Sequence, residues 1–153
     1  MNNMQQQDKD LLMKDLCGRL LYDVLLSHNT RNHVHKLTNI GKSGMVLITD
    51  IVTDKFTTTD VENVKPYLFP FSSMTEEQKK ELEELCDMHI PDETYSSYEY
   101  KGVRVLYKHA SDTGYKLLFN TDVIEWFHKN HIDYQGLIKK GLANDATNLN
   151  IYG

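Results

Sequence analysis

The stretch from Asp122 to Gly153 reads DVIEWFHKNHIDYQGLIKKGLANDATNLNIYG and holds the only tryptophan of the chain. At about 100° per residue, its first apolar side chains gather on one face of a helix: Val123, Ile124, Trp126 and Phe127. We therefore expect a helix from Asp122, capped by Asn120 or Thr121. A second short helix is expected over residues 133–140, with Gly141 just beyond its end. The two helices should form a corner that packs on a sheet and closes the fold.

The N-terminal part of the chain reads as a helix followed by short strands. Residues 1–7 are polar and are expected to form a disordered tail. From Asp8, apolar residues at helical spacing predict a helix with Asp15 on its solvent side. Short apolar and β-branched segments joined by polar turns then predict an antiparallel β meander. These segments cover residues 21–27, 33–40, 45–52 and 55–59.

Two signals mark the middle of the chain. The segment Lys65–Pro70 contains two of the three prolines. Because proline cannot donate a hydrogen bond to a sheet, we expect a connector there rather than a strand. Thr75 and Gln78 have the spacing of a capping box, which predicts the start of a helix. Pro91 marks the point by which that helix should end.

A second β element is expected before the C-terminal helices. Residues 103–108 alternate between apolar and polar, and residues 115–119 form the returning strand of a hairpin. The predicted fold class is therefore α+β, as a single domain over residues 8–153. It combines an N-terminal helix, a small antiparallel meander, a central capped helix, a β hairpin and a C-terminal pair of short helices.

The composition is that of an ordinary globular domain: 153 residues, 40% hydrophobic and 25% charged. The formal net charge of −5 argues against non-specific binding to duplex nucleic acid, which needs a basic surface. No apolar run approaches the roughly 20 residues of a membrane helix, and the polar N-terminus lacks a signal core. With only Cys17 and Cys86, no disulfide framework is expected. These features predict a cytoplasmic protein without a membrane partner.

Four histidines are the candidates for a metal site. His33 and His35 are two residues apart in an expected strand and therefore share a face. His128 and His131 are three residues apart on a helix and are neighbours. Together the two pairs offer four nitrogen ligands of the kind that zinc accepts. Such pairs are also common in metal-free proteins, and there is no His-Glu-x-x-His motif, so neither a metal nor a cofactor is expected.

The segment Asn39–Gly44, NIGKSG, resembles part of a phosphate-binding loop. The full motif requires glycine where the chain has Lys36, and a helix where the chain has the strand-like MVLITDIV. A hairpin turn is the favoured interpretation. Exposed backbone N–H groups and Lys42 could still contact an anion.

A group of tyrosines and basic residues is the candidate ligand-binding surface. Aromatic faces beside cations can stack a base and hold its phosphate. The alternative is a sheet face covered by tyrosines with hydrated hydroxyl groups. The candidate residues are Tyr95, Tyr98, Tyr100, Lys101, Arg104, Tyr107, Lys108 and Tyr115.

Three segments resemble a recurrent group of uncharacterised small accessory proteins of phages and mobile elements of gut bacteria. They are VKPYLFPFSSMTEEQKKELEELC at Val64–Cys86, WFHKNHIDYQGLIKKGLA at Trp126–Ala143, and KDLCGRL at Lys14–Leu20. The group has no assigned reaction, so the resemblance implies no catalytic residue. It implies a protein made in the cytoplasm of a bacterial host cell.

No catalytic motif is present, and no Gly-x-Ser-x-Gly elbow occurs. We therefore expect a non-enzymatic phage accessory protein, with a counter-defence role as the sharper hypothesis. It would sequester a nucleotide-type immune signal or block a host immune protein. Two alternatives remain open. One is a small His-dependent nucleotide hydrolase or phosphodiesterase, and the other is a protein–protein interaction module without a small ligand. Self-association into a homo-oligomer also stays open.

Overall fold

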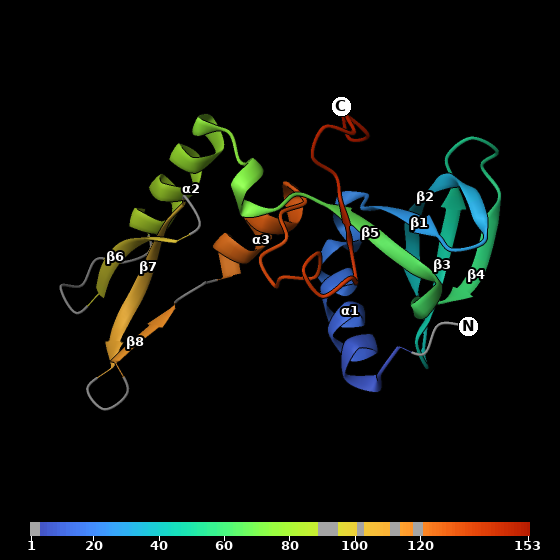
Figure 1. The fold of residues 1–153 in the computed structure, drawn as a ribbon, viewed down its shortest axis with the longest axis horizontal. Coiled ribbons are helices and arrows are strands. Elements are labelled where there is room, and N and C mark those ends of the chain that lie inside the picture. Colours follow the sequence, from blue (N-terminus) through green and yellow to red (C-terminus); the bar gives the residue numbers. More distant parts are fainter. Residues whose placement is uncertain (1–3, 89–94, 101–102, 111–113, 118–120) are drawn as a thin grey trace.

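The computed structural model describes residues 4–88, 95–100, 103–110, 114–117 and 121–153. These residues form an α+β fold with two sheets at opposite ends of an elongated molecule (Figure 1). The helices are α1 (Gln6–Arg19), α2 (Glu76–Met88) and α3 (Thr121–Lys129), with 3-10 turns η1 (Leu20–Tyr22), η2 (Val61–Asn63) and η3 (Phe71–Ser73). The strands are β1 (Leu25–His28), β2 (Arg31–Ile40), β3 (Met45–Asp50), β4 (Phe56–Asp60), β5 (Val64–Leu68), β6 (Tyr95–Tyr100), β7 (Val103–Ala110), β8 (Gly114–Leu117) and β9 (Asn144–Asp145).

The larger sheet has the strand order β4-β3-β2-β1-β5-β9. All its neighbours pair antiparallel except β5 and β9, which are parallel. The predicted meander is present as β1–β4. The first predicted strand, however, begins at Leu25 rather than at Leu21, because η1 continues from α1 and Asp23 then reverses the chain with a φ of 54°. One face of this sheet and α1 enclose the first core. Its fully buried members include Leu12, Leu16, Leu26, Val46, Ile48 and Leu68.

The segment expected to be a connector is instead strand β5. Val64, Pro66 and Leu68 all turn into the core, with Lys65 exposed between them. This alternation is a strand pattern, and the prolines obscured it. Pro66 lies opposite Leu26 in the ladder with β1. Val64 and Leu68 are both 0% exposed. The free energy gained by burying them exceeds the cost of the one backbone N–H donor that Pro66 lacks.

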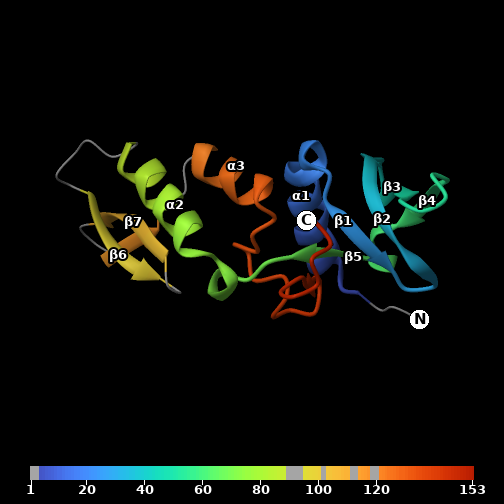
Figure 2. The ribbon, with the colours of Figure 1, turned by 90° about the horizontal axis from the view of Figure 1, so that it is seen from above.

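The smaller sheet contains β6, β7 and β8 in that order. The predicted hairpin corresponds to β7 and β8, although residues 118 and 119 lie outside the described residues. The tyrosine-rich segment 95–100 adds a third strand to it. Figure 2 shows the layers in sequence along the long axis: this sheet, α2, α3, α1 and the larger sheet. A second core between α2 and α3 joins the two ends. It includes Phe71, Met74, Leu82, Val123, Phe127 and Ile132.

The predicted capping box at the start of α2 is confirmed. The N–H of Thr75 donates to the side chain of Gln78 at 3.0 Å, and the N–H of Gln78 donates to Thr75 Oγ1 at 3.1 Å. At the N-terminus, α1 begins at Gln6, two residues earlier than expected, and Met4 packs against the first core. The predicted tail therefore contributes residues to the fold from Met4 onward.

The second C-terminal helix expected over residues 133–140 does not form. These residues make turns that lead to β9. Gly136 has a φ of 75°, a left-handed conformation that interrupts a helix. The Asp133 carboxylate accepts the N–H groups of Leu137 at 2.8 Å and Ile138 at 2.9 Å. In a helix, the N–H of Leu137 would instead donate to the Asp133 carbonyl, so the side chain has replaced the backbone acceptor.

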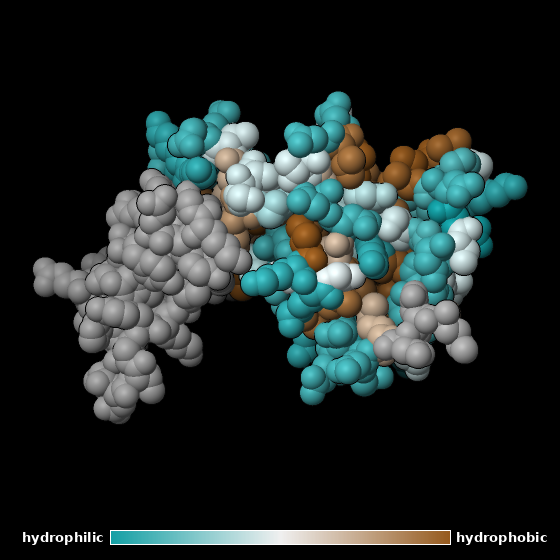
Figure 3. Space-filling model, in the orientation of Figure 1, coloured by the Kyte–Doolittle hydropathy of each residue, from teal (hydrophilic) through white to brown (hydrophobic). Residues whose placement is uncertain are grey.

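The apolar side chains of the β3–β4 end are exposed. Ile51, Val52 and Phe56 have 54%, 69% and 67% of their surface exposed. In Figure 3 a brown area lies at the upper right, over the loop that joins β3 to β4. We call these three residues the β3–β4 tip. Within the described residues, no helix is both long and apolar enough to cross a membrane.

Tyr152, near the C-terminus, bridges strands β1 and β5 through its hydroxyl group. The β1–β5 ladder pairs Leu26 with Pro66, and its next step would pair Leu25 with Tyr67. At that step the N–H of Leu25 donates to Tyr152 Oη at 2.9 Å, and the Tyr152 hydroxyl donates to the Tyr67 carbonyl at 2.8 Å. The hydroxyl thus takes the place of a direct backbone hydrogen bond. Burial raises the pKa of Tyr152, which keeps this donor protonated.

Replacing Tyr152 with phenylalanine should lower the free energy of unfolding by about 1–2 kcal/mol, because a partly buried N–H and a partly buried carbonyl lose their hydrogen-bond partner. Urea denaturation measures the change. The matched control is Tyr67→Phe, since the Tyr67 hydroxyl makes no hydrogen bond to a described residue. Equal stability of Tyr152→Phe and the wild type would contradict the bridging role.

Candidate functional site

The residues of the predicted tyrosine-rich surface lie on the smaller sheet. The pairing register divides them between the two faces of that sheet. Residues that pair across antiparallel strands share a face. Tyr95 pairs with Lys108, and Arg104 pairs with Glu99. The register therefore places Tyr95, Arg104 and Lys108 at positions of one face. It places Tyr98, Tyr100, Tyr107 and Tyr115 at positions of the other face. Lys101 lies outside the described residues, and ligand binding by this set stays a prediction.

The segment 39–44 forms the hairpin turn between β2 and β3, as favoured from sequence. The N–H of Gly41 donates to the Met45 carbonyl at 2.8 Å, and the N–H of Met45 donates to the Lys42 carbonyl at 3.2 Å. Ser43 and Gly44 both have a positive φ. Lys42 is exposed and forms no ion pair with a described residue, so its anion contact stays a prediction.

The two histidine pairs lie on different elements. His33 Nδ1 lies 2.8 Å from Asp50 Oδ2. His35 is buried, and its Nδ1 lies 2.9 Å from the His33 carbonyl. His128 lies on α3 and His131 in the turn that follows. Among the residues that the structure describes, no three His, Cys, Asp or Glu side chains converge into a group that could hold a metal ion.

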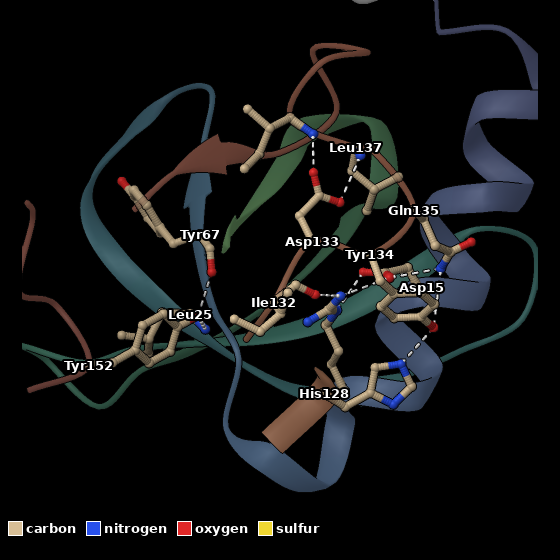
Figure 4. Close-up of polar contacts among 12 residues, drawn as sticks. Asp15, Leu25, Tyr67, His128, Ile132, Asp133, Tyr134, Gln135, Leu137 and Tyr152 are labelled. Carbon is tan, nitrogen blue, oxygen red and sulfur yellow. Dashed lines mark hydrogen bonds and ion pairs between the residues drawn. The ribbon is translucent and has the colours of Figure 1, made fainter. Parts of the chain in front are cut away.

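A buried ion pair connects α1 to the C-terminal segment (Figure 4). Asp15 and Arg19 are both almost fully buried, so the sequence-based placement of Asp15 on the solvent side of α1 was wrong. Arg19 Nε donates to Asp15 Oδ2 at 2.7 Å, and Arg19 Nη2 donates to the Ile132 carbonyl at 2.7 Å. The Gln135 amide donates to Asp15 Oδ1 at 2.9 Å. Asp15 and Arg19 therefore lie in the part of α1 that the C-terminal segment covers, whereas Lys14 and Cys17 of the same helix are exposed.

His128 and Tyr134 complete this network. His128 Nε2 lies 2.9 Å from the Tyr134 hydroxyl, and the Arg19 guanidinium lies 5.7 Å from the centre of the Tyr134 ring. Burial and the nearby Arg19 charge lower the pKa of His128, and burial raises the pKa of Tyr134. A histidine, a tyrosine and an ion pair are groups that acid–base catalysis uses. His128 is only 8% exposed, however, and its contacts are those of a structural junction.

Gly18 lets the His128 ring lie directly against α1. A Cβ atom at this position would stand 2.3 Å from His128 Cε1. The sequence showed Gly18 only as an uncertain helix end, whereas α1 continues through it to Arg19. Glycine is required here by the close approach of the two elements.

The β3–β4 tip is the candidate binding surface. Asp50 Oδ1 accepts the N–H groups of Val52 at 2.8 Å and Thr53 at 3.1 Å. The N–H of Asp50 donates to the Lys55 carbonyl at 2.9 Å, and Asp50 Oδ2 contacts His33. These hydrogen bonds hold the turn in one conformation. The turn therefore loses less conformational entropy when a partner binds. Strand β4 is the outer strand of the sheet and pairs with no described strand on its far side.

Sequence reasoning missed this tip. Residues 45–52 were interpreted as one strand, but β3 ends at Asp50. The signal was present in the run MVLITDIV, because an apolar pair that follows Asp50 lies beyond the strand and inside a turn. Exposed large apolar residues in a turn are informative, since loops are usually polar.

Comparisons with known proteins give no match: no family model, no curated protein and no solved structure is similar to this chain.

Gly18→Ala should destabilise the protein by about 1–3 kcal/mol, because the new methyl group overlaps the His128 ring. In an open helix the same change would stabilise by about 0.5–1 kcal/mol. Thermal or urea unfolding measures whether Gly18→Ala lowers or raises the free energy of unfolding. In a His128→Ala background the destabilisation should vanish, and a Gly18→Ala penalty that persists there would contradict the contact.

Acid should destabilise the fold through His131. Burial and the Arg19 charge lower the pKa of His131 from 6.5 to about 4. Between these values the unfolded chain binds a proton that the folded protein excludes, so stability falls as pH drops from about 6.5 to about 4. His131 has a φ of 57°, which asparagine tolerates. Urea titrations of His131→Asn should show a smaller fall over this range than the wild type, and an identical fall would contradict the assignment.

Proposed function

We propose that this chain is a non-enzymatic binding protein that blocks a partner protein through its β3–β4 tip. The observation that carries the proposal is the exposure of three large apolar side chains on a hydrogen-bonded turn. The resemblance to phage and mobile-element accessory proteins that we expect from the sequence would make a bacterial host protein the partner, with host immunity as the process that is blocked. Counter-defence is thus the biological role within this proposal.

The energetics of the tip favour a protein partner. Burial of apolar surface contributes about 25 cal/mol per Å², and Ile51, Val52 and Phe56 each expose more than half of their surface at this end of the sheet. Polar Thr57 and Thr58 follow on the strand, and Lys55 and Asp54 lie beside the turn. An apolar centre with a polar rim is the usual organisation of a binding patch. The outer strand β4 could extend this contact by pairing with a strand of the partner.

The buried histidine also supports the non-enzymatic proposal. A His-dependent hydrolase would need an accessible imidazole near its substrate. His128 is enclosed by Gly18 and Tyr134, and His35 is buried in β2. His33 is exposed but engages Asp50, which holds the tip. These positions favour packing and turn geometry as the roles of His33, His35 and His128.

The test compares three forms of the protein as bait in lysate of a gut bacterium. Val52→Ser/Phe56→Ser removes the apolar centre, and Leu21→Ser is the matched control, because Leu21 is 86% exposed and lies in η1. We expect the wild type and the control to retain one host protein in stoichiometric amount. The tip variant should lose it while keeping its melting temperature, since exposed residues contribute little to stability.

Retention of the same protein by all three forms would contradict the proposal. A change from dimer to monomer in the tip variant, measured by light scattering after size-exclusion chromatography, would also contradict it, because the tip would then be a contact between two copies of this chain.

A further inference from the structure

A polar hollow lies on the larger sheet and is lined by other residues than those of the β3–β4 tip. It has a volume of about 290 Å³ and is lined by Ser27, Asn29, Glu62, Asn63, Lys65 and Asn144. These residues come from β1, the β1–β2 turn, η2, β5 and β9. All six side chains are polar. Segments more than 100 residues apart in the chain are thus brought together around one small concave surface.

The amide groups of the hollow are held in place by their own donors. Asn29 Nδ2 donates to Asn63 Oδ1 at 3.0 Å, and Asn63 Nδ2 donates to Thr59 Oγ1 at 3.2 Å. Asn144 Nδ2 donates to Ser27 Oγ at 2.8 Å and to the Lys65 carbonyl at 3.2 Å. The side chains are therefore fixed before any ligand arrives, as small-molecule sites usually are.

This arrangement leaves acceptors and donors available. Within the described residues, the side-chain oxygens of Asn29 and Asn144 accept no hydrogen bond. Ser27 Oγ accepts from Asn144, so its own hydroxyl proton can donate outward. The Lys65 ammonium forms no ion pair with a described residue. The hollow thus presents two carbonyl acceptors beside a hydroxyl and an ammonium donor.

These groups define the chemistry of the ligand. An apolar ligand would bury the amide oxygens without partners, which costs about 1–3 kcal/mol each. A multiply charged anion would meet Glu62 and the amide oxygens with one cation, Lys65, to compensate. Neighbouring hydroxyl groups fit best, because each hydroxyl both donates and accepts.

A second hollow of about 490 Å³ is also lined by Glu62 and Lys65 and extends to Gln5, Asp8 and Leu142. Glu62 also binds Lys9 of α1 at 3.3 Å, which fixes the wall between the two. The first hollow is at the small end of the size range of ligand sites, roughly 300–1,000 Å³. It suits one ring.

We propose that this hollow binds a neutral polyhydroxylated ligand, either a saccharide unit or the ribose of a nucleoside. Asn29 and Asn144 accept from its hydroxyl groups, and Ser27 and Lys65 donate to its oxygens. None of the residues that line the hollow belongs to the β3–β4 tip.

The test is a titration of the isotope-labelled full chain, followed by two-dimensional NMR. The probes are neutral mono- and disaccharides, nucleosides and inorganic phosphate. We expect saturable shifts in the backbone and side-chain amide signals of Asn29, Asn63 and Asn144 with a saccharide or a nucleoside. The neutral saccharides and the nucleosides distinguish the two sources of the hydroxyl groups.

A pair of matched variants locates the binding. Asn29→Ala/Lys65→Ala removes one acceptor and one donor from exposed positions of the hollow, and Lys14→Ala/Asn32→Ala makes the same change in composition elsewhere on the surface. The first should weaken binding about tenfold or more, and the second should leave it unchanged. The proposal is overturned by three results: no saturable shift with any neutral probe, shifts with phosphate alone, or shifts confined to β6–β8.

Discussion

The buried pair of Asp15 and Arg19 is the interaction on which the rest of the structure depends. Helix α1 packs against the larger sheet and the C-terminal segment, and Asp15 and Arg19 lie in its buried part. A charge in that position is tolerated only with a partner, and removal of one member of such a pair costs about 3–5 kcal/mol. Arg19 also holds the Ile132 carbonyl, which ties the ion pair to the chain beyond α3.

The turn after α3, which Arg19 holds, is hydrogen-bonded to the residue that follows β5. The His131 carbonyl accepts the N–H of Phe69 at 2.8 Å, and the N–H of Asp133 donates to the Phe69 carbonyl at 2.8 Å. The backbone just beyond β5 is thereby registered against the turn that Arg19 holds. The chain then reaches β9, where Asn144 pairs with Tyr67 and forms a wall of the polar hollow. The ion pair, the strand register and the hollow therefore belong to one continuous arrangement.

Local patterns in the sequence predicted the elements whose causes are local. The capping box at Thr75 and the helix from Asp122 rest on neighbouring residues, and both are present. Asp15 and β5 could not be predicted in the same way. Asp15 is buried by Gln135, 120 residues away, and β5 is a strand because two distant segments pair with it on either side. The β3–β4 tip is a third case. Its apolar residues are evident in the sequence, but the sequence pattern does not show that β3 ends at Asp50.

The position of Tyr152 in the β1–β5 ladder has a consequence for the order of folding. The contact between Leu25 and Tyr152 spans 127 residues, and it lies at the end of the β1–β5 ladder. Strands β1 and β5 pair directly from Leu26 to His28, but the step at Leu25 is complete only once Tyr152 has reached it. Contacts of this separation slow folding, because the chain loses loop entropy before they form. Completion of this one step of the ladder is thus a late event, and the polar hollow, which needs Asn144, also depends on a contact of long sequence separation.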